Sequence, residues 1–534
     1  MTRFCSSRYK TRAHNSVYFC NIFDASIVFG ASSMKFDCST PKNHNTALAA
    51  ICAHSVSISI GICQGYSAIL LPQLKKSPKY MNLTSDETTW IASLGTITNP
   101  LGSILSGLLA EYMGRKRAIQ ITALPLILGA MCFGLAQNIN WLYAGRLITG
   151  IAAGMSPACY TYVGEISTSQ NRGFMQTLGP ICASFGILLT YTLGYVLHWT
   201  TVAYISISFA VFSTVVMQLV PESPSYLLKN DRQAEGFRVL LWLRGNNALA
   251  QREIDRFYEN RKEAGCKETG FRDTYFGPQN VKPFLVLVGL FVFQEFSGIY
   301  TLLFYAVSFF EDSELSFNEY VASIIVGGIR FSMSIAIAYL INVYGRKVLC
   351  TASSVGMAAT MSAVAVYVKY YEDHPGEAKL APYIPLVGVI LNVGFSMVGM
   401  LPVPWVMVGE MFPLNVRPIM SGIVVSIAQL LIFFCVKIYD NMKEALDFSG
   451  TLFVFVGASV LSAVYCTTIL TETKNKTLEE IEAHFRGDSC LCGGGDSELV
   501  VVKVDVMKAG IDNAGFDGSL EGRSNAKDGG EVVS

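Results

Sequence analysis

The amino-acid sequence predicts an all-α membrane protein with twelve transmembrane helices in two pseudo-symmetric six-helix halves. Its composition is the first observation behind this prediction. Of the 534 residues, 51% are hydrophobic and only 15% are charged, whereas about 25% are charged in an ordinary soluble chain. Such a chain cannot cover a water-facing surface. The second observation is that apolar stretches near the roughly 20 residues that a helix needs to cross the hydrocarbon core recur along the chain.

These apolar stretches fall into two groups of six. The first group comprises residues 48–72, 89–110, 118–137, 141–163, 174–197 and 201–220. The second group comprises residues 283–309, 320–343, 347–368, 383–409, 418–438 and 449–470. Every backbone amide in lipid must be satisfied internally, so long runs rich in Leu, Ile and Gly indicate a helical bundle rather than a barrel.

The same pattern divides the chain into five parts. Two six-helix halves, 47–220 and 283–470, flank a polar segment, 221–282, that is rich in Arg and Glu and predicts a cytoplasmic linker with short helices. The N-terminal tail 1–46 and the C-terminal tail 471–534, which is rich in Gly, Ser and Asp, are predicted to be cytoplasmic and mostly disordered.

Positive charge sets the predicted orientation. Lys and Arg favour short cytoplasmic loops, and here they fill the loop after 89–110 (Arg115, Lys116) and the loop after 320–343 (Arg346). Both termini are then inside, and we expect the cell membrane as the location. Asn82 begins a glycosylation sequon in the first outside loop, which predicts a glycoprotein.

Several functional classes are disfavoured. Lys plus Arg and Asp plus Glu each number 40, so no basic excess points to nucleic acid, and the six His form no metal motif. No nucleophile–base set or phosphate loop occurs in the polar segments, so we expect no enzyme and no cofactor. Most of the 14 Cys lie singly in apolar runs, which argues against a disulfide framework.

The two halves repeat the same charged pattern. Gly-Arg-Lys follows the second span at 114–116 and the eighth span at 345–347. A Glu precedes an Arg by seven residues after the fourth and the tenth spans, and these pairs are Glu165 with Arg172 and Glu410 with Arg417. Two similar halves joined by a linker suit a transporter whose halves rock about a central site.

We therefore expect a cytoplasmic gate in which ion pairs cross the seam between the halves, lock one state and break in the other. The alternative is that these basic residues only anchor the topology. The predicted gate residues are Arg115, Arg146, Glu165, Arg172, Glu222, Arg346, Glu410 and Arg417. Lys437, near the outer end of 418–438, is interpreted as a residue that extends its charge to the membrane interface.

Motifs in this order and spacing resemble the sugar porter family of the major facilitator superfamily over nearly the whole of 50–480. Its insect facilitated trehalose transporters are the most similar group. The motifs that carry the resemblance are Gly145-Arg146, Tyr162-Val163-Gly164-Glu165, Arg172-Gly173, Pro221-Glu222-Ser223-Pro224, Phe293-Gln294, Ser297-Gly298-Ile299, Pro402-Val403-Pro404-Trp405 and Glu472-Thr473-Lys474.

The resemblance implies a sugar site in a wet central cavity. A sugar needs side-chain amides for its hydroxyls and an aromatic face for its ring, and the family pattern assigns these roles to Gln294 and Trp405. This chain departs from the pattern elsewhere, because Glu295, Tyr300 and Arg330 replace amide ligands. The predicted substrate-binding residues are Gln294, Glu295, Tyr300, Arg330, Trp405 and Gln429.

Arg330 lies in an apolar span, where a lone base is costly, so we hypothesise that it pairs with Glu295 in the cavity. The competing hypothesis is that Arg330 stays free and binds an anionic substrate.

The resemblance further implies a monomeric uniporter that moves a hexose or trehalose by alternating access. Proton-driven members carry an acid where this chain has Ser67, which favours facilitated transport. Two other functions remain open at this point: a non-transporting sugar sensor on the same scaffold, and a carrier of a non-sugar organic solute.

Overall fold

The structure is a computed structural model. It describes residues 41–76, 84–168, 171–265, 276–305, 318–374, 381, 383–412, 416–474, 476, 480–481 and 484–485. Every regular element within these ranges is helical. Asn82, most of both predicted tails and the side chain of Arg417 lie outside the described residues.

The first half contains six helical spans, of which three are broken into two helices. Pro100 and Pro157 each stand at the start of a new helix, because proline lacks the N–H that would continue the preceding one. The elements are α3 (Pro41–Lys76), α4 (Ser85–Ile97), α5 (Asn99–Met113), α6 (Arg115–Ile121), α7 (Ala123–Gly134), α8 (Ile139–Gly154), α9 (Pro157–Ile166), α10 (Arg172–Val196) and α11 (Trp199–Val216).

The second half repeats this organisation. Its elements are α16 (Pro278–Phe296), α17 (Ile299–Phe304), α19 (Glu319–Val343), α20 (Arg346–Asp373), α21 (Ile384–Val398), α22 (Val403–Glu410) and α23 (Arg417–Thr468). The 52-residue α23 covers the last two predicted spans, and its backbone turns sharply at Asp447, where φ is 62° and ψ is 173°.

Each of the twelve predicted spans falls on helix. Within the described residues, eight stretches are individually long and apolar enough to cross a membrane. The difference has a simple cause. The predicted spans 89–110, 141–163 and 283–309 are each divided between two shorter helices, and α23 joins two spans in one helix.

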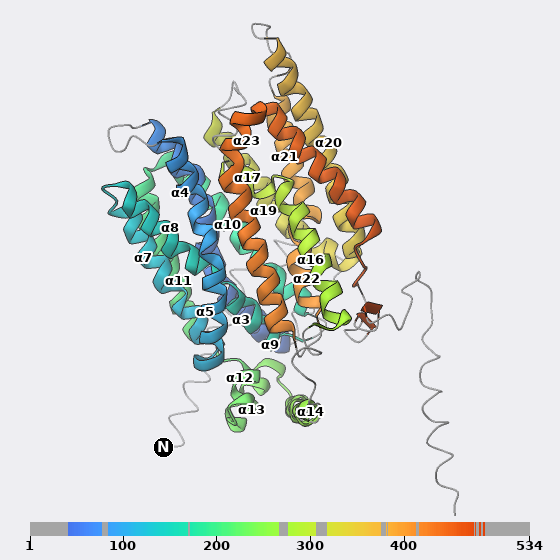
Figure 1. Ribbon diagram of the computed structural model, residues 1–534. Helices are drawn as coiled ribbons and strands as arrows, with labels where there is room; N and C mark the ends of the chain where they lie inside the picture. The colour runs from blue at the N-terminus through green and yellow to red at the C-terminus, as the bar shows by residue number, and fades with distance from the viewer. Residues whose placement is uncertain are drawn as a thin grey trace, which may run out of the picture. The chain divides into compact units, whose positions relative to one another are not determined.

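The short η1 (Met217–Leu219) ends the first half, and the predicted linker 221–282 forms α12 (Pro224–Lys229), α13 (Gln233–Arg244) and α14 (Asn247–Gly265). The last three lie together at one end of the membrane helices (Figure 1). The Arg244 guanidinium donates to the Ile166 carbonyl at 2.9 Å and pairs with Glu253 at 2.7 Å. These contacts fix the linker helices to the end of α9 in the first half.

The two halves pack against each other along two seams. On one, α10 lies against α19, and on the other, α23 lies against α4 and α5. One aromatic pair crosses each seam: Phe185 contacts Phe331 across the first, and Trp90 contacts Phe433 across the second. The candidate site lies next to the first seam.

Candidate substrate site

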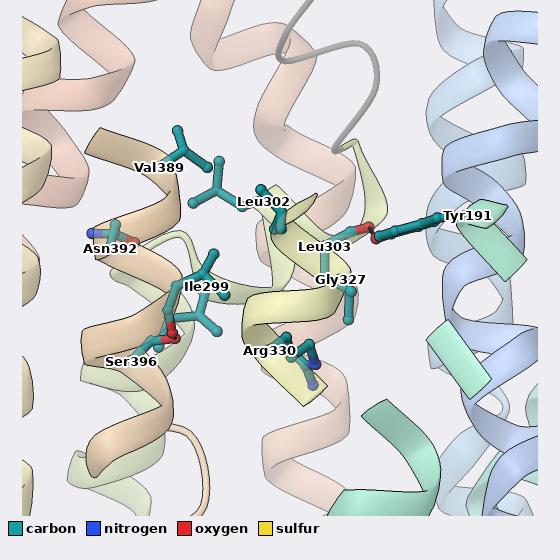
Figure 2. Close-up of a pocket in the computed structure, with 11 residues that line it drawn as sticks. Tyr191, Ile299, Leu302, Leu303, Gly327, Arg330, Val389, Asn392 and Ser396 are labelled. Carbon is teal, nitrogen blue, oxygen red and sulfur yellow. Dashed lines mark hydrogen bonds between the residues drawn. The ribbon is translucent and has the colours of Figure 1, made fainter. Parts of the chain in front are cut away.

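A pocket lies where α10 of the first half meets α17, α19 and α21 of the second (Figure 2). Most of its wall is aliphatic, with Arg330, Asn392, Ser396 and Tyr191 as the polar exceptions. The complete lining is Tyr191, Ile299, Leu302, Leu303, Val326, Gly327, Arg330, Val389, Asn392, Val393 and Ser396. Side chains from both halves therefore meet at one pocket.

The break between α16 and α17 positions one wall of this pocket. Gly298 adopts a left-handed conformation with φ of 81°, which glycine tolerates because it has no Cβ. A Cβ at this position would lie 2.6 Å from the Phe455 ring. The break turns the chain so that Ile299, Leu302 and Leu303 face the pocket.

Arg330 is the one predicted substrate residue in the lining of this pocket. Arg330 is only 8% exposed, its Nε has no hydrogen-bond partner, and no ion pair to it is found among the described residues. Figure 2 shows it on the opposite side of the pocket from Asn392 and Ser396. A buried guanidinium is thus presented to the pocket without a counter-ion from the described part of the chain.

The predicted ion pair between Glu295 and Arg330 is wrong for this structure. Glu295 is 1% exposed, and both of its carboxylate oxygens lack a hydrogen-bond partner among the described residues. It projects from α16 into the protein, whereas Arg330 projects from α19 into the pocket lining. Tyr300 interacts electrostatically with both groups. Sequence spacing could not reveal that no ion pair joins the two charges.

Gln294 and Trp405 lie beside the break rather than in the pocket lining. Gln294 is fully buried, and its amide nitrogen donates to the Leu401 carbonyl at 3.2 Å, while its Oε1 has no partner in the described chain. Trp405 on α22 packs edge-to-face on Phe291 with ring centroids 5.1 Å apart, and its side chain interacts with that of Tyr300. Tyr300 and Trp405 are therefore neighbours, as the predicted site requires.

Gln429 joins the two halves. Its side-chain amide lies 2.6 Å from that of Asn99, so a hydrogen bond links α23 to the start of α5. Asn99 is itself placed by the helix break at Thr98. Gln429 therefore contributes to the seam, a role that its position in the sequence did not indicate.

The predicted gate residues of the first half form a cluster at the linker end. Arg115 pairs with Glu165 at 3.0 Å, and Glu165 also accepts a hydrogen bond from Ser223. Glu222 accepts from the backbone N–H of Lys116 at 3.0 Å. These contacts join α6, α9 and the segment that precedes α12.

The second half repeats this cluster. Arg346 pairs with Glu410 at 2.8 Å, and the Thr473 hydroxyl donates to Glu410 at 2.7 Å. Glu472 accepts from the backbone N–H groups of Arg346 and Lys347 at 2.9 and 3.1 Å. Glu472 and Thr473 thus match Glu222 and Ser223 by position. The internal repeat was the signal that could have placed Glu472 in the cluster.

These clusters correct one part of the gate prediction. Both ion pairs lie within a single half, whereas they were expected to cross the seam. The reason is local, because each Arg begins a helix and each Glu lies at or next to the last residue of a neighbouring helix in the same half. Arg172 is exposed, and its contact with the cluster stays a prediction.

Arg146 also departs from the gate prediction. It lies in the middle of α8, is 2% exposed and donates to the Ser67 hydroxyl at 2.5 Å and to the Cys63 carbonyl at 3.3 Å. Its guanidinium faces the rings of Tyr66 and Phe133 at 5.6 and 5.4 Å. Arg146 therefore holds α8 against α3 inside the first half.

Lys437 forms a contact across the seam that the sequence did not indicate. Its ammonium lies 2.5 Å from the Asp86 carboxylate and 2.7 Å from the Thr89 hydroxyl, and 4.4 Å from the centre of the Trp90 ring. The contact joins α23 to the start of α4, at the end of the helices opposite α12–α14 (Figure 1). We call these four residues the outer latch, because the sequence predicts that this end of the helices faces outside.

Comparisons with known proteins extend over most of the chain. The model of the family described as "Sugar (and other) transporter" matches residues 29–485. The facilitated trehalose transporter Tret1 of Bombyx mori is 31% identical over 437 residues, which are 82% of this chain and 86% of that protein. The facilitated glucose transporter member 8 of solute carrier family 2 from Bos taurus is 29% identical, covering 84% of this chain and 96% of that protein.

Solved structures share the arrangement of helices. The proton:xylose symporter XylE bound to 6-bromo-6-deoxy-D-glucose has a TM-score of 0.68 and 22% identity, covering 82% of this chain and 99% of that chain. An inward-open structure of XylE from E. coli has a TM-score of 0.66 and 21% identity, covering 82% of this chain and 98% of that chain. At this identity the likeness concerns the fold.

Proposed function

Because the chain belongs to the sugar (and other) transporter family, we propose that it is a facilitative carrier that moves a hexose or trehalose by alternating access. Its fold is the all-α fold of the major facilitator superfamily, which makes it a multi-pass membrane protein. The sugar assignment is supported by relatives named as trehalose and glucose transporters.

The observation that carries the mechanism is the pocket lined from both halves. Tyr191 of α10 donates to the Leu303 carbonyl of α17 at 3.0 Å, so the first half closes one wall of a pocket built mainly by the second. Relative motion of the halves would open this wall. A site that is completed only when two bodies meet is what alternating access requires.

The contacts between the two halves support a separation of the halves at the linker end. The outer latch and the Asn99–Gln429 pair join the halves, whereas the described ion pairs of the linker-end clusters stay within one half. The halves can therefore separate at the linker end without losing either cluster. With the linker placed in the cytoplasm, this arrangement corresponds to a carrier closed to the outside, in the cell membrane with both termini inside.

Substrate recognition would come from the residues around the helix break. Gln294 has an amide oxygen without a partner in the described chain, and Asn392 likewise has a free amide oxygen. Each can accept a hydrogen bond from a sugar hydroxyl. Tyr300 and Trp405 would supply aromatic surface for the sugar ring. None of these roles needs a cofactor or a catalytic group.

Facilitated rather than proton-driven transport is supported by the partner of Arg146. The hydroxyl of Ser67 fills the place where proton-driven members of the family carry an acid, and a hydroxyl does not titrate in the physiological range.

The test is uptake by the purified full chain in proteoliposomes. Labelled glucose and trehalose are expected to equilibrate across the membrane without accumulating and without moving a proton. A small non-sugar organic acid serves as the negative control. Failure to move either sugar would contradict the proposal, and sugar binding without uptake would instead indicate a sensor.

A further inference from the structure

Arg330 is a buried cation whose charge no described residue balances. It is 8% exposed in the pocket, its Nε has no hydrogen-bond partner, and no carboxylate pairs with it among the described residues. The uncharged hydroxyls of Tyr191 and Tyr300 interact with it electrostatically. Placing an unpaired base in an apolar span is costly, and such residues usually mark a substrate pathway. The charge at this position therefore needs a partner that the described chain does not supply.

The other polar side chains of the pocket lining are uncharged and donate hydrogen bonds elsewhere, and the Asn392 amide oxygen has no partner in the described chain. The Tyr191 hydroxyl donates to Leu303, the Asn392 amide nitrogen donates to the Met357 carbonyl at 3.2 Å, and the Ser396 hydroxyl donates to the Val393 carbonyl at 2.8 Å. Glu295, the acid nearest in sequence to this region, is enclosed away from the pocket lining. Arg330 is thus the free charged donor of this pocket.

We propose that Arg330 pairs with a carboxylate on the substrate, so that this carrier accepts a hexuronate and binds it more tightly than a neutral sugar of the same shape. The inference rests on the proposed function and specifies its substrate class. A guanidinium presents paired N–H donors that match the two oxygens of a carboxylate.

The composition of the pocket favours one carboxylate over other anions. A single guanidinium balances one negative charge, whereas a phosphate ester carries nearly two at neutral pH. The aliphatic wall formed by Ile299, Leu303 and Val326 lowers the local polarity, which strengthens an ion pair formed there. The same wall can contact the carbon face of a pyranose ring.

The test compares two inhibitors that differ in charge alone. Uptake of labelled glucose into proteoliposomes is measured against D-glucuronate and against D-glucuronamide, its neutral amide of the same shape. In the parent chain, we expect glucuronate to inhibit at a concentration about tenfold lower than the amide, the size of one charge-assisted contact. Equal inhibition by the two compounds would overturn the proposal.

Variants then assign the effect to this residue. In Arg330→Gln the ratio between the two inhibitors is expected to fall to about one, whereas Arg330→Lys should retain part of it. Arg232→Gln removes an exposed guanidinium of the linker, which pairs with Glu235, and should leave the ratio unchanged. An unchanged ratio in Arg330→Gln would also overturn the proposal.

The design separates this inference from the proposed function. If neither glucose nor trehalose enters the vesicles, the proposed function fails. Thermal stabilisation of the purified full chain by glucuronate and by glucuronamide then measures the same preference without transport. Stabilisation by glucuronate at concentrations about tenfold lower supports the inference, and equal stabilisation contradicts it. This comparison in the parent chain does not depend on the folding of any variant.

Discussion

The Lys437 ammonium lies 2.5 Å from the Asp86 carboxylate and thereby joins the last long helix of the second half to the first turn of α4. Trp90, one turn further along α4, presents its ring to the same ammonium. The outer latch thus combines a salt bridge with a cation–π contact. It lies on the seam that must open if the carrier is to face outward.

Removing the outer latch should shift the carrier toward the outward-open state. Asp86 is largely exposed, so solvent screening reduces the pair to about 0.5–1 kcal/mol, and Lys437→Ala should increase the outward-open population about two- to fivefold. Distances between spin labels on α4 and α23 measure this shift. The exchanged pair Asp86→Lys with Lys437→Asp should reverse it, and Lys369→Ala, at an exposed pair within α20, is the control. Unchanged distances in Lys437→Ala would contradict a latch.

The linker-end clusters should act on stability within one half. Arg346 and Glu410 are mostly buried, so Arg346→Gln is expected to lower the free energy of unfolding by about 1.5–3 kcal/mol. A double-mutant cycle with Glu410→Gln, followed by unfolding in detergent, measures their coupling. The exposed Arg232→Gln should change stability by less than about 0.5 kcal/mol. If Arg346→Gln left the free energy of unfolding unchanged but altered access to the site from the two membrane sides, Arg346 would instead act across the seam.

Glu295 and Arg330 should behave as independent sites. Because no ion pair joins them, Glu295→Gln and Arg330→Asn are expected to have additive effects on stability, with a coupling below about 0.5 kcal/mol. Glu295→Gln alone removes a buried carboxylate that has no described hydrogen-bond partner and should leave stability equal or higher. If Arg330→Asn restored a damaged Glu295→Gln chain, the two groups would pair in another state of the carrier.

An acid at position 67 should make transport depend on protons. The Ser67 hydroxyl lies 2.5 Å from the Arg146 guanidinium, so Ser67→Asp places a titratable group beside a fixed positive charge. We expect an inward proton gradient to stimulate the uptake of labelled sugar in this variant. A pH dye inside the vesicles reports the protons that enter with the sugar. The neutral Ser67→Asn has nearly the same shape and should stay insensitive to the gradient. Equal behaviour of the two variants would remove position 67 from the coupling argument.

Gly298 should tolerate no side chain. Its φ of 81° disfavours other residues, and a Cβ would lie 2.6 Å from the Phe455 ring, so Gly298→Ala should cost about 1–3 kcal/mol and reduce transport. Gly328 is the matched control, because it lies in regular helix and a Cβ there would meet no atom within 4 Å. Gly328→Ala should be neutral or slightly stabilising. Thermal unfolding of both variants measures the difference, and equal melting temperatures would contradict this account of the break.

The local motifs predicted which residue types would pair. Whether a pair lies within one half or crosses the seam depended on packing. The repeated Gly-Arg-Lys and Glu-to-Arg spacings pointed to Arg115, Glu165, Arg346 and Glu410, and in the structure these residues form two ion pairs. They could not distinguish a pair within one half from a pair across the seam, since both arrangements use the same residues at the same helix ends. The prediction that Arg146 belongs to the gate failed for a similar reason, because its motif does not indicate toward which neighbouring helix its side chain points.

The amino-acid sequence by itself determined the helical bundle, its two halves and the linker, because span length and loop charge are properties of contiguous residues and the bilayer imposes them directly. The tertiary structure alone decided the partners of isolated polar residues. Lys437 pairs with Asp86 and Gln429 contacts Asn99, each about 330 residues or more away along the chain. Glu295 and Arg330 form no pair among the described residues. Such pairings follow from the angles at which helices cross, and these angles depend on side-chain packing throughout the protein.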